Sequence, residues 1–150
     1  WVVGPKELVA GMQLIQDQST SNPSSIAQKA ALAAVAGPAD SVETMRVEFQ
    51  ARRDLIVKGL NAIPGVRCRL PEGAFYVFPN VEELIGKRHQ GQPITGSVRL
   101  SEVLLEHFLV AAVPGEPFGA EGYLRLSFAA SRETIGKGLE RLKQLVSSLS

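Results

Sequence analysis

The chain has 150 residues, a length typical of one domain or of a small domain with part of a neighbour. Its hydrophobic fraction of 45% suits a core of ordinary size, and 16 basic against 15 acidic side chains leave a formal charge of +1. No block of like charge is present, so the composition indicates neither a nucleic-acid nor a membrane partner. No apolar run approaches the ~20 residues of a membrane-spanning helix, and we expect a cytoplasmic protein.

The beginning of the chain indicates a strand end followed by two helices. The opening WVVGP is apolar and strand-like and lacks an initiator methionine, which suggests a piece of a longer protein. Apolar residues at helical spacing follow Pro5, and Asn22-Pro23 marks a turn before an alanine-rich helix over residues 25–36. We therefore expect residues 1–38 to form one part of the protein and residues 39–150 a second, tightly linked part.

A long amphipathic helix opens the second part. Its apolar stripe extends over about six turns, with members at Val42, Met45, Phe49, Ile56, Leu60 and Ile63. The period then changes to two, and residues 66–70 and 74–79 predict an antiparallel hairpin. Cys68 lies in the first of these strands, where we expect a buried side chain, and a single cysteine excludes an intrachain disulfide.

The rest of the chain predicts further helices around a small sheet. In chain order we expect a short helix at 80–86, a polar surface loop at 86–97, a helix at 98–108, a strand at 109–115, a loop at 116–122, a strand at 123–128 and a final helix capped by Ser131. The predicted fold class is α/β, with an α+β small domain in which helices pack on a small mixed or antiparallel sheet.

The common catalytic signatures are weak in this sequence. His89 lies in the polar loop and His107 on a helix, without cysteine or carboxylate at ligand spacing, so we expect no metal site. Hydrolase, phosphate-loop and dinucleotide-binding motifs are absent. Glu82-Glu83 is typical of the exposed face of a short helix. All six lysines lie in segments typical of a surface: Lys6, Lys29, Lys58, Lys87, Lys137 and Lys143.

One charged residue interrupts an apolar strand. The segment EGYLRLSFAAS, residues 121–131, places Arg125 where an unpaired charge is costly. One interpretation is a structural ion pair, or an edge strand from which the side chain reaches solvent. The other is a planar donor that binds a carboxylate through two hydrogen bonds, a task to which arginine is better suited than lysine. The residues alone leave both interpretations open.

This segment and the amphipathic helix after it resemble the C-terminal signature of the fold-type I, pyridoxal-phosphate-dependent aminotransferases, in particular the aspartate/aromatic class I group. Further segments are similar in the same order: WVVGPKEL, QSTSNPSSIAQKAALAAV, RRDLIVKGL, PEGAFYVFP and VAAVPGEPFG. The resemblance covers essentially all 150 residues. It implies the end of a large cofactor-binding domain at residues 1–38 and a small domain at 39–150 that begins with a long linking helix.

The resemblance also implies an activity and a role for one residue. Arg125 would bind the α-carboxylate of the amino acid or 2-oxo acid substrate, and pyridoxal 5'-phosphate would be the cofactor. The family's Schiff-base lysine and its phosphate-binding arginine correspond to positions upstream of Trp1. The resemblance therefore assigns no catalytic or cofactor-binding residue to this chain, and we expect the chain alone to be inactive.

The resemblance leaves the substrate side chain open, with aspartate as the leading expectation, and it implies a homodimeric parent enzyme. An alternative from a different class is a self-standing, non-catalytic α/β binding or regulatory module, which would explain the absent lysine without any missing segment. The strand-like start and the helix pair before residue 37, which has no sheet of its own to cover, favour the aminotransferase interpretation.

Overall fold

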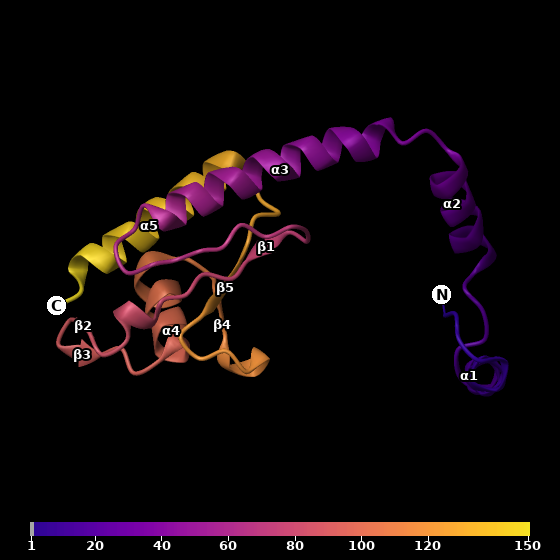
Figure 1. Cartoon of the computed structure of the whole chain (residues 1–150), viewed down its shortest axis with the longest axis horizontal. Coiled ribbons are helices and arrows are strands. Elements are labelled where there is room, and N and C mark those ends of the chain that lie inside the picture. Colours follow the sequence, from indigo (N-terminus) through magenta and orange to yellow (C-terminus); the bar gives the residue numbers. More distant parts are fainter. Residues whose placement is uncertain (1) are drawn as a thin grey trace. The chain divides into compact units, whose positions relative to one another are not determined.

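The computed structural model describes residues 2–150 (Figure 1) and divides into two compact units, the first ending at Ser41 and the second covering Val42–Ser150. In the first unit, α1 (Lys6–Ser19) and α2 (Ser25–Ala36) confirm the predicted helix pair. Residues 2–5 have no regular secondary structure, so the predicted opening strand is not found there, and Trp1 lies outside the described residues.

The described residues of the first unit form no core. Neither α1 nor α2 contains a buried residue. The exposed large apolar side chains of this unit are those of Val2, Val3, Leu8, Met12, Leu14, Ile15, Ile26, Leu32 and Val35. So many exposed apolar side chains are typical of a surface that another protein segment covers.

Two long helices lie side by side in the second unit (Figure 1). The 22-residue α3 (Asp40–Asn61) confirms the predicted long helix, and α5 (Arg132–Ser148) confirms the predicted final one. Gly59 lies where the two helices meet: a Cβ atom at this position would lie 2.3 Å from Cδ1 of Leu139, so the leucine side chain would have to shift. Leu60, the next residue of α3, is fully buried in the core.

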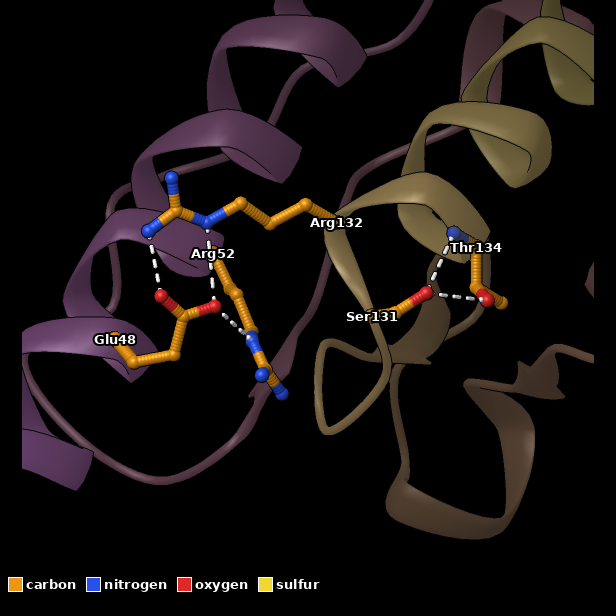
Figure 2. Close-up of polar contacts among 5 residues, drawn as sticks. All are labelled: Glu48, Arg52, Ser131, Arg132 and Thr134. Carbon is orange, nitrogen blue, oxygen red and sulfur yellow. Dashed lines mark hydrogen bonds and ion pairs between the residues drawn. The ribbon is translucent and has the colours of Figure 1, made fainter.

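A charged cluster joins the same two helices (Figure 2). Glu48 on α3 accepts hydrogen bonds from Arg132 Nη2 at 2.5 Å and from Arg52 Nε at 2.7 Å. Both hydrogen bonds lower the pKa of Glu48, which is about 2, and the bond from Arg132 is the larger cause. At the start of α5, the Ser131 hydroxyl accepts a hydrogen bond from the Thr134 amide at 3.1 Å, which confirms the predicted N-cap.

The sheet of the second unit is small and antiparallel. Its central strand β5 (Leu124–Ser127) lies between β1 (Tyr76–Val77) and β4 (Val113–Pro114). Helix α4 (Ser97–Phe108) packs close to β4 and to α5. The arrangement of helices on a small antiparallel sheet confirms the predicted fold class.

The predicted hairpin of residues 66–70 with 74–79 is wrong. Residues 66–70 form no strand, and the isolated bridge that Arg67 makes is to Asn80, one residue beyond the second segment. The ladder partner of β1 is instead β5, far along the chain. The predicted short helix after this segment is a 3₁₀ turn, η1 (Glu82–Leu84).

The predicted surface loop at 86–97 contains a small hairpin and a buried histidine. Strands β2 (Arg88–His89) and β3 (Gln92–Pro93) pair antiparallel. His89 is only 7% exposed, against the expectation of a solvated loop residue. Its ring lies 5.6 Å from that of Phe108 on α4, and its Nδ1 lies 3.3 Å from the hydroxyl of Ser148 on α5. Packing of the loop against two helices therefore overrides its polar composition.

A single apolar core fills the second unit. Its buried members are Ile56, Val57, Leu60, Ile63, Val66, Cys68, Val77, Val81, Leu84, Ile94, Leu100, Val103, Leu104, Leu124, Phe128, Ile135, Leu142, Leu145 and Val146. Among the described residues, none of the helices combines the length and the hydrophobicity needed to cross a lipid bilayer.

The buried imidazole of His89 predicts a loss of stability in mild acid. Burial first, and then the charges of His107 and Arg99, lower the pKa of His89 below its ordinary value. The unfolded chain binds this proton more readily, so the free energy of unfolding should fall as the pH drops below about 6.5. Urea unfolding at about pH 8 and about pH 5.5 measures this difference on either side of the ordinary histidine pKa.

Two variants test whether His89 is the source of this pH dependence. Ser148 donates its own proton to the carbonyl of Leu145, so His89 Nδ1 carries a hydrogen and donates it to Ser148. His89→Asn keeps a donor and cannot titrate, and it should flatten the pH dependence. His107→Asn, at an exposed neighbour, should keep most of the dependence. An unchanged dependence in His89→Asn would contradict the prediction.

The Glu48 cluster predicts a measurable shift in one carboxyl group. Arg132→Ala removes the largest cause of the low pKa, so the pKa of Glu48 should rise from about 2 toward its ordinary range. Carbon-detected NMR titration of the Glu48 carboxyl group measures the change. Lys137→Ala removes a cation from the same helix, one that pairs with Glu133, and should leave Glu48 unaffected. An equal shift in both variants would argue against a specific contact.

Candidate functional site

Arg125 lies in the middle of the central strand and points away from the core. Side chains alternate along a strand, and Leu124 is fully buried while Leu126 packs against the core. The register pairs Tyr76 with Ser127, so Tyr76 shares the face of Arg125. Because β5 has a neighbour on both sides, the edge-strand interpretation of Arg125 does not hold.

Aromatic rings surround the guanidinium of Arg125. Its Cζ lies 4.9 Å from the ring centroid of Phe118 and 5.4 Å from that of Tyr76. Phe78 makes an edge-to-face contact with Phe118, with ring centroids 6.1 Å apart, and stacks on Tyr123 at a centroid distance of 5.2 Å. Such cation–π contacts attract the charge and confine the flexible side chain, but they do not use its hydrogen-bond donors.

No carboxylate of the described residues neutralises Arg125. It takes part in none of the ion pairs within residues 2–150, and no acceptor in that range hydrogen-bonds to its guanidinium. The residue is half-buried. A partly desolvated charge is stabilised best by a paired anion. The five donors of this guanidinium are therefore free to bind a carboxylate, as the second interpretation of Arg125 requires.

A tight turn presents Phe118 to the arginine. The turn η2 (Glu116–Phe118) is closed by hydrogen bonds from Phe118 N to the Gly115 carbonyl, at 2.8 Å, and from Gly115 N to the Tyr123 carbonyl, at 2.9 Å. Gly115 is required here, because a Cβ atom would lie 2.0 Å from the carbonyl oxygen of Ala120. The hydrogen bonds of this turn consequently fix the backbone position of Phe118.

A groove of about 1170 Å³ lies beside this cluster. Its lining includes Tyr76, Phe78 and Tyr123 on one side and residues 67–74 on the other. A smaller, largely apolar cavity of about 330 Å³ lies among α3, α4 and α5. Arg125 lines neither the groove nor the cavity. Its guanidinium therefore lies against the rings of Phe118 and Tyr76 rather than inside a closed pocket.

The other residues that the sequence singled out do not form a second site. His89 and His107 have ring centroids 5.2 Å apart, and among residues 2–150 no group of three potential metal ligands occurs. Cys68 is buried as predicted, and burial raises the pKa of its thiol. Glu82-Glu83 is exposed at η1, where Glu83 pairs with Arg67. All six lysines are exposed.

Sequence analysis missed the aromatic partners of Arg125. Tyr76 and Phe118 come from segments distant in the chain, and each was treated as part of a strand or a loop. The period-two pattern of AFYVFP could have placed Tyr76 beside Arg125, but only if β1 had been paired with β5 instead of with residues 66–70. No local signal marks Phe118.

Comparisons with known proteins show the family of the chain. The family model for aminotransferases of class I and II matches residues 1–142. The chain is 47% identical to an aspartate aminotransferase of Streptomyces avermitilis, over 98% of this chain and 36% of that protein. It is 44% identical to an aspartate/prephenate aminotransferase of Cereibacter sphaeroides, over 100% of this chain and 38% of that protein.

The fold has close counterparts among solved structures. The aspartate aminotransferase of Rhizobium meliloti superposes with a TM-score of 0.94 at 43% identity, over 98% of this chain and 37% of that one. The aromatic aminotransferase of Pyrococcus horikoshii superposes with a TM-score of 0.86 at 32% identity, over 97% and 37%. These matches show that the chain has the fold of the corresponding part of an aminotransferase.

The chain belongs to the aminotransferase class I and II family. It spans somewhat more than a third of the length of the relatives that it matches, between 36% and 38%.

Proposed function

We propose that this chain provides the substrate-carboxylate site of an aminotransferase, which transfers an amino group between an amino acid and a 2-oxo acid with pyridoxal 5'-phosphate. The observation that carries the proposal is the unpaired guanidinium of Arg125, held between Phe118 and Tyr76 at the centre of the sheet. Membership of the family supports the same assignment.

In this proposal Arg125 binds and orients the substrate. Two parallel N–H···O bonds from one guanidinium fix both the position and the plane of an α-carboxylate. Fixing that plane limits rotation of the substrate, and thus selects the bond at Cα that is aligned for reaction. The flanking rings of Phe118 and Tyr76 exclude water from the sides of the guanidinium, which strengthens its bonds to an anion.

The cofactor would be held by residues outside this chain. A lysine that binds such a cofactor covalently is activated by desolvation or by a neighbouring charge, whereas every lysine here is exposed. The cofactor, when bound, supplies the electron sink for the reaction. This chain would contribute substrate orientation, and the proton-transferring group would come from elsewhere in the enzyme.

We further propose aspartate as the amino acid substrate. The relatives from Streptomyces avermitilis and Cereibacter sphaeroides are an aspartate and an aspartate/prephenate aminotransferase, which supports a dicarboxylic amino acid. Residues 1–38 would form the end of a large cofactor-binding domain, and residues 39–150 the small domain. The exposed apolar side chains of α1 and α2 would be covered by the rest of that large domain, and the complete enzyme would be a homodimer.

A self-standing binding module is the other candidate. The exposed, largely unpartnered α1 and α2 argue against it, because a module that functions alone seldom leaves so many apolar side chains in water. An open reading frame that continues upstream of Trp1 into a lysine-containing aminotransferase segment would decide between the two.

Substitution of Arg125 in the full-length enzyme tests the proposed role. Charge-assisted hydrogen bonds contribute about 1.5–3 kcal/mol each, so Arg125→Ala should lower kcat/KM for aspartate by roughly two to four orders of magnitude. Arg125→Lys should recover only part of the loss, because a point charge cannot hold the carboxylate plane. Steady-state kinetics and the melting temperature are measured on the same samples.

A control substrate and a control variant separate binding from stability. An amine that lacks the α-carboxylate should be almost insensitive to Arg125→Ala. Arg88→Ala removes a guanidinium from the exposed β2–β3 hairpin, where it bonds the Gly91 carbonyl, and should leave kcat/KM unchanged. Equal losses on both substrates, or a loss of melting temperature alone, would return Arg125 to a structural role.

The isolated chain gives a further test. Because the proposed lysine lies outside it, the 150-residue chain should show no amino-group transfer, and added pyridoxal phosphate should leave no stoichiometric adduct after borohydride reduction and desalting. The apolar face of α1 and α2 should bind a fluorescent hydrophobic dye or drive self-association in light scattering. A stoichiometric adduct at one lysine would contradict the proposed division of the site.

A further inference from the structure

Hydrogen bonds of a buried serine and a glutamate connect η2 to the start of α4. Ser97 is 0% exposed, and its hydroxyl donates to Glu116 Oε2 at 2.5 Å while it accepts from Gly115 N at 3.4 Å. The other carboxylate oxygen, Oε1, accepts from Val98 N at 3.3 Å. The N-cap residue of α4 is Gly96, which has no side chain to satisfy these amides, so Glu116 performs the capping from a different segment.

The same turn carries the ring that contacts the arginine. Glu116 and Phe118 are the two ends of η2, and the Phe118 ring centroid lies 4.9 Å from Cζ of Arg125. Phe118 is 51% exposed, and besides Arg125 its ring makes an edge-to-face contact with Phe78, with centroids 6.1 Å apart. Packing alone therefore holds this ring weakly. Glu116 adds two side-chain hydrogen bonds between the turn and the start of α4.

We propose that Glu116 and Ser97 are positioning residues for Arg125, acting through Phe118. The inference rests on the proposed function, because it concerns the same carboxylate-binding guanidinium. An arginine side chain has many rotamers, and the ring restricts it to those that present its donors on the outer face of the sheet. If η2 is released from α4, the ring moves, and the guanidinium loses part of its orientation before substrate arrives.

Substitution of Glu116 and of Ser97 in the full-length enzyme tests this proposal. Glu116→Ala and Ser97→Ala should each lower kcat/KM for the α-carboxylate substrate by about tenfold, mainly through a higher KM. The amine that lacks the α-carboxylate should be affected little. Glu116→Gln keeps one acceptor for the amide of Val98 and should recover part of the loss. Glu121→Ala, an exposed carboxylate just beyond the turn, is the matched control and should leave both substrates unchanged.

A double substitution shows whether Glu116 acts on Arg125 through the ring of Phe118. Phe118→Ala should reproduce the selective loss, and Glu116→Ala combined with Phe118→Ala should cost no more than Phe118→Ala alone. Additive losses would overturn the proposed route. Equal losses on both substrates together with a lower melting temperature would show a purely structural role, and would also overturn it.

The outcome for Arg125 distinguishes this inference from the proposed function. If Arg125→Ala gives a selective loss and neither Glu116→Ala nor Ser97→Ala does, the positioning role is wrong while the carboxylate site stands. If Arg125→Ala itself gives no selective loss, both are wrong.

Discussion

The alternation of side chains along β5 determines where the guanidinium lies. Leu124 is buried and Leu126 packs on the core, whereas Arg125 between them occupies the opposite face. A register shift of one residue would move the arginine into the core and both leucines out of it. Burial of each leucine contributes roughly 1.5–3 kcal/mol, and an unpaired charge in the core costs several kcal/mol, so both effects select the same register. The apolar core thereby positions a polar group.

The helices could be predicted because their signals are local. The apolar periodicity of α3 and the serine cap of α5 lie within a few residues of the helices that they define, and the structure has both helices close to their predicted bounds. The predicted stripe itself is buried only in part, because Val42 and Met45 are exposed and Ile63 lies beyond the end of α3. A side-chain oxygen that accepts a hydrogen bond from an amide three residues later needs no tertiary context. The same reasoning identified Ser131 from the sequence alone.

Strand pairing and the surroundings of the site could not be predicted in this way. Tyr76 pairs with Ser127, a partner about fifty residues away, and not with the neighbouring residues 66–70. Alternation is equally consistent with either partner, so a local pattern cannot choose between them. His89 shows the same limit: polar neighbours predicted exposure, and Phe108 with the end of α5 covers it instead.

The two units differ in whether their apolar side chains are covered by contacts within the unit itself. The second unit has a core, a capped α4 and a sheet that holds Arg125 between aromatic rings, so the carboxylate site that we propose would depend on contacts within Val42–Ser150. In the first unit neither α1 nor α2 has a buried residue, so the apolar side chains of these helices have no covering partner within the two helices. Orientation of the substrate would thus be encoded in a part of the enzyme with its own core. Under the proposed function, cofactor chemistry would be encoded in the large domain to which α1 and α2 would belong.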